Sequence, residues 1–257
     1  MIRGSYISKV AAFFVLGSAV WAADLLVVDR GLPQANLNNV SGTARSNVRW
    51  ASDGESFLGD DFSIGALGER WVIDSIRTWA VPGMKFDPEH LGDFYQDVRL
   101  YFGLSNGSLT PRVTATLQAG SDDTSSANVL ISEATKAGAV PYDDFGAAMR
   151  IWQIDFSNLN LVVNGGVKYG FGVWGLGRAI PGNGDKGFKW FNHASNAELS
   201  GVKQDGADGL MLTFDGSGKA QGSFSAQGNG WDKNSDINVQ VFAHRVSGPS
   251  GTLAAAQ

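Results

Sequence analysis

The stretch that decides the fold is Trp71-Val72-Ile73-Asp74-Ser75-Ile76-Arg77-Thr78-Trp79. Apolar side chains stand at both odd and even positions of this run. That pattern is typical of a central strand that is covered on one face of its sheet and partly covered on the other. We therefore expect residues 71–79 to form a central strand.

Shorter runs of alternating apolar and polar residues surround this stretch, separated by clusters of Gly, Asn, Asp and Ser. Such spacing is typical of sandwiches and barrels. The chain has 34 glycines, and no long segment carries apolar residues at helical spacing. The sequence therefore predicts an all-β fold: a single antiparallel β-sandwich, jelly-roll-like, of about ten strands. Besides residues 71–79, strands are expected at residues 97–102, 113–117, 149–156, 168–174, 188–193, 210–214, 222–226 and 236–246, with weaker ones at 61–64 and 129–132, an edge strand at 25–28 and a short helix at 88–94.

The N-terminus has the pattern of a secretory signal peptide. Arg3 and Lys9 supply positive charge, an apolar run follows, and small residues lead to Ala22. The apolar run is too short to span a bilayer, which needs roughly 20 residues. We expect a signal peptide at residues 1–22, a β-sandwich domain at 23–246 and a flexible tail at 247–257. The product is expected to be secreted, extracellular or periplasmic, with no membrane span after cleavage.

Charge and composition exclude several classes of partner. The 257 residues include 20 basic and 25 acidic ones, and losing Arg3 and Lys9 with the signal peptide changes the net charge from −5 to −7. No basic cluster is present that could neutralise phosphates, so neither nucleic acid nor an anionic membrane surface is expected as a partner. The absence of cysteine excludes disulfides, thiol nucleophiles and Cys-based metal sites.

Several segments resemble a known group of proteins. They are Asp29-Arg30-Gly31-Leu32-Pro33, Arg45-Ser46-Asn47-Val48-Arg49-Trp50, Gly59-Asp60-Asp61-Phe62 and Lys168-Tyr169-Gly170-Phe171-Gly172-Val173-Trp174-Gly175. Together with the central run, these segments resemble uncharacterised exported β-sandwich proteins of environmental bacteria. They are also similar to ectodomains that carry an exosortase-type, Pro-Glu-Pro sorting signal. This chain lacks that C-terminal signal, which favours free secretion over surface anchoring. The resemblance implies a fold but no activity.

Catalytic patterns are weak. Gly103-Leu104-Ser105-Asn106-Gly107 matches the nucleophile elbow of α/β-hydrolases, but that elbow needs a helix after the turn. Here Asn-Gly favours a hairpin turn before another strand. The three histidines, His90, His193 and His244, lack the spacing of metal ligands and are interpreted as satisfied or surface residues. No catalytic residue is predicted.

Calcium is the one cofactor that the sequence suggests. Asp232, Asn234 and Asp236 offer oxygen ligands at alternate positions, as in the first half of a calcium loop. The glycine at position six and the glutamate at position twelve of such a loop are missing. A structural calcium ion and an ordinary Asp/Asn turn therefore stand as alternatives.

Exposed tryptophans are the other candidates for a binding site. Flat sugar faces stack on aromatic rings, and the four candidates near glycine-rich or polar segments are Trp79, Trp174, Trp190 and Trp231. The alternative is that these rings fill the core.

The function expected from these features is a secreted, non-catalytic binding module for polysaccharide or matrix glycan. The alternative is a structural, self-assembling protein of the envelope or extracellular matrix, whose strand edges contact other copies. A hydrolase of unrecognised type is the third interpretation, since acidic side chains far apart in sequence can meet in a fold.

Overall fold

The structure is a computed structural model that describes residues 24–32, 50–51, 56–82, 89–134, 142–144, 147–178, 190–192, 209–214, 219–225 and 236–246. Within these ranges nearly all regular structure is β-strand. No helix in this part of the chain is long and apolar enough to cross a membrane.

The first sheet is built around the long strand β4 (Arg70–Pro82), which contains the run that the sequence singled out. Its strands follow the order β1-β16-β4-β10-β7, and β11 and β13 also pair with β4. Both faces of β4 carry buried apolar side chains, Ile76 on one face and Trp79 on the other, which explains why its apolar positions do not alternate strictly. The other strands of this sheet are β1 (Leu25–Asp29), β2 (Trp50–Ala51), β7 (Val129–Glu133), β10 (Trp152–Phe156), β11 (Leu161–Asn164), β13 (Trp190–Asn192) and β16 (Val239–Arg245).

The second sheet closes on itself. Its order is β12-β3-β14-β15-β6-β5, and β5 is hydrogen-bonded back to β12. Closure removes the open edges that a flat sheet would have. The strands are β3 (Ser56–Ser63), β5 (Tyr95–Leu104), β6 (Ser108–Thr116), β12 (Lys168–Gly177), β14 (Gly209–Phe214) and β15 (Ala220–Ser225), and a separate pair consists of β8 (Tyr142–Asp144) and β9 (Ala147–Met149).

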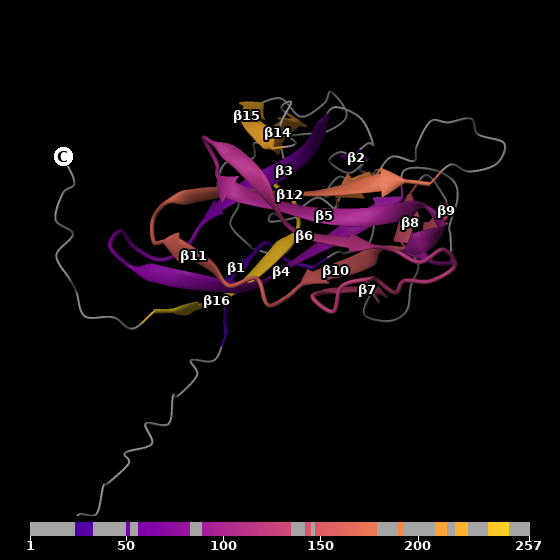
Figure 1. Cartoon of the computed structure of the whole chain (residues 1–257), viewed down its shortest axis with the longest axis horizontal. Coiled ribbons are helices and arrows are strands. Elements are labelled where there is room, and N and C mark those ends of the chain that lie inside the picture. Colours follow the sequence, from indigo (N-terminus) through magenta and orange to yellow (C-terminus); the bar gives the residue numbers. More distant parts are fainter. Residues whose placement is uncertain are drawn as a thin grey trace, which may run out of the picture.

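The two sheets share one hydrophobic core. Figure 1 shows them as layers, with β5 and β12 above β4, β10 and β16. The second sheet contributes an aromatic cluster in which Phe62 lies 5.7 Å from Phe171 and 6.2 Å from Phe102, ring centre to ring centre. Burying each such ring stabilises the fold by roughly 1.5–3 kcal/mol. The all-β sandwich of antiparallel strands is therefore confirmed.

Three elements differ from those expected from the sequence. The expected helix at residues 88–94 is reduced to the 3-10 helix η2 (Leu91–Asp93). The run expected at residues 149–156 is divided, since β9 ends at Met149 and β10 begins at Trp152. Strand β11 was not predicted, because it has only four residues and follows Asn158 and Asn160, both with positive φ.

The segment that resembles a nucleophile elbow is a hairpin turn, as predicted. Strand β5 ends at Leu104, β6 begins at Ser108, and the N–H of Gly107 donates to the carbonyl of Leu104 at 3.0 Å. No helix follows Ser105, so the strand–turn–helix geometry of a hydrolase nucleophile is absent at this serine.

Candidate functional site

The face of the β4 sheet that points away from the core is defined by the strand register. Antiparallel partners share a face, and successive residues alternate between faces. Ile76 and its partner Val241 are buried in the core. The next residue, Arg77, therefore points outward, beside its register partners Gln240 on β16 and Asp155 on β10.

Hydrogen-bonded side chains cross this outward face. Gln240 Nε2 donates to Asp29 Oδ1 at 3.3 Å, and Arg77 Nη1 donates to Gln240 Oε1 at 3.4 Å. Arg77 Nε donates to Asp155 Oδ1 at 2.5 Å, and Gln153 Nε2 donates to Asp155 Oδ2 at 2.8 Å. These five residues, called the polar row, lie on four adjacent strands. Neighbouring strands are about 4.8 Å apart, so the row from β1 to β10 is about 14 Å wide.

Apolar side chains flank the polar row on the same face. The guanidinium of Arg77 lies 5.7 Å from the ring centre of Phe242, a cation–π contact. Leu26 is the register partner of Phe242, and Leu130 is the partner of Asp155. These leucines are 44% and 64% exposed, so the face combines fixed polar groups with accessible apolar surface.

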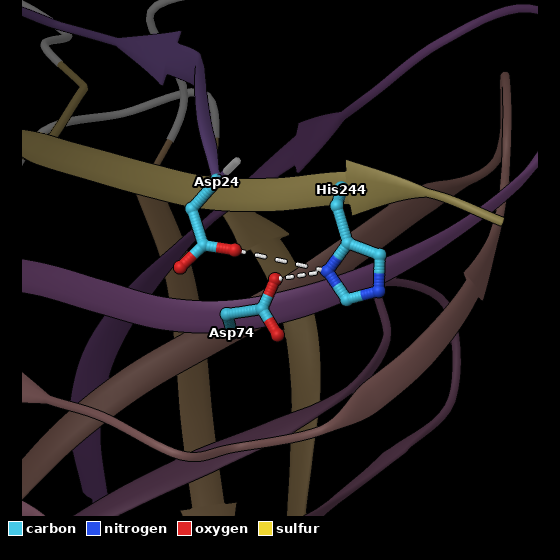
Figure 2. Close-up of side chains that lie close together, drawn as sticks. All are labelled: Asp24, Asp74 and His244. Atoms are coloured by element: carbon cyan, nitrogen blue, oxygen red, sulfur yellow. Dashed lines mark hydrogen bonds and ion pairs between the residues drawn. The ribbon is translucent and has the colours of Figure 1, made fainter. Parts of the chain in front are cut away.

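A second group on this face consists of Asp24, Asp74 and His244 (Figure 2). His244 Nδ1 lies 2.6 Å from Asp74 Oδ2 and 3.7 Å from Asp24 Oδ1. The three residues lie on or next to β1, β4 and β16, which are neighbours in the sheet. Figure 2 shows both carboxylates directed at the same ring nitrogen.

A β-bulge explains how Asp74 reaches this position. Phe242 pairs with Ser75 and Ala243 pairs with Ile73, so Asp74 is the extra residue of β4 at this point. A bulge kinks its strand and changes the direction of the side chain. The carbonyl of Asp74 still accepts a hydrogen bond, from the N–H of Leu159 at 3.0 Å.

The electrostatics of the group follow from its partial burial. Desolvation raises the pKa of the Asp74 carboxyl, the hydrogen bond to His244 opposes that change, and the nearby Asp24 carboxylate raises the pKa further. Two carboxylates that converge on one nitrogen repel each other, and a cation or a proton between them relieves the repulsion.

The predicted calcium residue Asp236 lies elsewhere, in a buried ionic cluster between the sheets. Asp236 Oδ2 is 3.6 Å from Arg30 Nε, and Arg30 Nη1 donates to Asp60 Oδ2 at 2.5 Å. Burial raises the pKa of Asp60 well above its usual value; Arg30 opposes this, and the charge on Asp236 adds to it. The other two calcium candidates, Asp232 and Asn234, lie outside the described residues, so the calcium site stays a prediction.

Two of the four candidate tryptophans can be placed by their side chains. Trp79 is 1% exposed, so its ring has no face available to a sugar, although its register partner Gln153 places it on the outward face of the sheet. Trp174 is 7% exposed, and the Arg99 guanidinium covers its ring at 4.6 Å from the centroid. Trp190 belongs to β13, but its side chain is outside what the structure describes, as is the whole of Trp231.

Neither the polar row nor the Asp24–Asp74–His244 group was predicted from the sequence. The available signal was a charged or polar residue at an outward position of a predicted strand, such as Asp74, Arg77 or His244. That signal indicates only a solvated face, because hydrogen-bonded partners are as many as 211 positions apart in the chain.

Comparison of the chain with protein-family models, with curated proteins and with solved structures found no match.

Proposed function

We propose that this chain is an exported, non-catalytic module that binds polysaccharide through the outward face of the β4 sheet. The observation that carries the proposal is the polar row, in which Asp29, Gln240, Arg77, Asp155 and Gln153 are held in place by one another. Polar groups that are already fixed lose little conformational entropy when a ligand binds, which favours affinity.

The chemistry of the row suits a ligand rich in hydroxyl groups. Carboxylates accept hydrogen bonds, a guanidinium donates up to five, and side-chain amides do both. Only Nε and Nη1 of Arg77 donate to protein groups within the described residues, which leaves Nη2 for a ligand. Leu26 and Leu130 add apolar surface against which the C–H face of a sugar ring can pack.

The test is retention of the purified chain on a panel of insoluble polysaccharides, with bound and unbound fractions measured by depletion. We expect the wild-type chain to be retained on at least one class of polysaccharide. Arg77→Ala and Asp155→Ala should each lower the affinity at least tenfold. Each substitution removes a ligand contact and also releases its partner in the row.

Arg99→Ala is the matched control, because Arg99 also pairs with an aspartate, Asp97 at 2.8 Å, but on the other sheet. It should leave retention unchanged. If Arg99→Ala abolished binding while Arg77→Ala did not, the binding site would lie on the second sheet beside Trp174, not on the β4 sheet. Failure of the wild-type chain to bind any member of the panel would overturn the proposal.

Self-assembly is a second candidate, favoured by the exposure of the N-terminal strand. β1 is the first strand of the sheet order, and its Leu25 and Leu26 are 55% and 44% exposed. A strand at the edge of a sheet can pair with another chain. Light scattering across a concentration series would test this, with Leu25→Lys expected to abolish any association found in the wild type.

A further inference from the structure

We propose that Asp24, Asp74 and His244 bind a divalent transition-metal ion of the zinc class. Their ligand atoms all lie within 4.8 Å of one another, and no other three His, Asp, Glu or Cys side chains within the described ranges meet that condition. The proposal does not depend on polysaccharide binding, although both sites are on the same face.

The distances fit a zinc ion with small movements of the side chains. Zinc binds histidine nitrogen and carboxylate oxygen at about 2.0–2.2 Å in a tetrahedral arrangement, which separates the ligand atoms by roughly 3.3 Å. The distances from His244 Nδ1, 2.6 Å to Asp74 Oδ2 and 3.7 Å to Asp24 Oδ1, bracket that value. The ion would occupy the position between Nδ1 and the two carboxylates, in place of the hydrogen bond between His244 and Asp74.

The donor set favours zinc over calcium. Calcium takes six to eight oxygen ligands, and an imidazole nitrogen is a poor member of such a set. One imidazole and two carboxylates match the ligands of zinc and its neighbours among the divalent transition metals. Three protein ligands also leave one tetrahedral position open to water.

The charge and the rigidity of the group support the same conclusion. Two carboxylates bring two negative charges to a single imidazole, so the site has an excess of negative charge for a cation to balance. Asp74 and His244 lie on paired central strands, and Asp24 directly precedes β1. Ligands on strands lose little freedom on binding, and the ion would fasten β1 to β16 and β4.

The experiment is titration of the untagged, metal-free chain with Zn²⁺ in a calorimeter. We expect one ion per chain, and at least tenfold weaker binding for His244→Ala and for Asp74→Asn. His90→Ala is the matched control, because His90 Nδ1 lies 3.5 Å from Asp122 Oδ2 without a further carboxylate in a group of three. Wild-type affinity in His244→Ala would overturn the proposal.

Two measurements on the wild-type chain keep the test decisive if a variant folds poorly. Addition of Co²⁺ should produce the visible absorption of a tetrahedral nitrogen–oxygen site, reversed by EDTA. Zn²⁺ at a hundred times its dissociation constant should raise Tm by roughly 5–10 °C. A chain with neither response does not bind metal here, and His244 is then a hydrogen-bonded surface histidine.

Discussion

Arg30 and Asp60 form an ion pair that joins the two sheets through the core. Arg30 directly follows β1 of the first sheet, Asp60 lies in β3 of the second, and Nη1 of the arginine is 2.5 Å from Oδ2 of the aspartate. The N–H of Ile237 also donates to Asp60, at 2.5 Å, so the segment before β16 is held at the same point. The N-terminal strand is thus anchored at its inner end, which opposes its displacement by a strand from another chain.

Removing the cation from this cluster should destabilise the fold strongly. Arg30→Met leaves Asp60 and Asp236 buried without their guanidinium, and breaking a buried ion pair typically costs about 3–5 kcal/mol. Urea unfolding followed by circular dichroism measures the change. Arg150→Met is the control, because Arg150 lies 3.7 Å from an exposed Glu133, and it should cost less than about 1 kcal/mol. Equal effects of the two substitutions would contradict this account of the core.

Glu69 should make stability depend on pH in the acid range. Its carboxylate accepts hydrogen bonds from the N–H of Ala66 at 2.9 Å and from Trp71 Nε1 at 3.1 Å, and these bonds lower its pKa. A lowered folded-state pKa stabilises the protein above the ordinary pKa of about 4.5, and that contribution is lost as the pH falls through the folded value. Glu69→Gln should therefore be less stable than the wild type at pH 7, and the difference should shrink below pH 4.5. Thermal melts from pH 7 to pH 3 provide the measurement, and a constant difference would refute the role of ionised Glu69.

Gly65 should not tolerate alanine. Its φ of +61° disfavours any other residue, and a Cβ built there would lie 2.2 Å from Trp71 Nε1. We expect Gly65→Ala to lower the free energy of unfolding by about 1–3 kcal/mol. Gly107→Ala is the matched control, since its nearest new contact is an ordinary 3.6 Å from Leu104 Cβ, and it should be neutral or slightly stabilising. Denaturant unfolding of both variants provides the comparison.

Arg99 should shield Trp174 from solvent. The guanidinium lies 4.6 Å from the ring centre and is paired with Asp97. Arg99→Ala should increase acrylamide quenching of the Trp174 fluorescence and cost roughly 0.5–1 kcal/mol in stability. The contribution of Trp174 to the fluorescence of Arg99→Ala is obtained by subtracting the fluorescence of the Arg99→Ala, Trp174→Phe double variant. Unchanged quenching would mean that other groups, and not Arg99, cover the ring.

Much of the secondary structure could be predicted because its signal is local. Alternation places Val239 and Val241 on the core face of β16 and Gln240 and His244 on the opposite face, as the run at residues 236–246 indicates. The expected edge strand at residues 25–28 corresponds to β1. The closure of the second sheet was not predictable, because the pairing of β15 with β6 joins segments about a hundred residues apart.

The sequence by itself determined that this chain forms short antiparallel strands, since backbone preference and the two-residue period act between near neighbours. Only the tertiary structure decided which polar side chains meet. Asp24, Asp74 and His244 converge because β1, β16 and β4 pair in one register and a bulge adds Asp74 to its strand. That register depends on the burial of Ile73, Ile76 and Val241 in a core that both sheets complete, and no local run of residues encodes it.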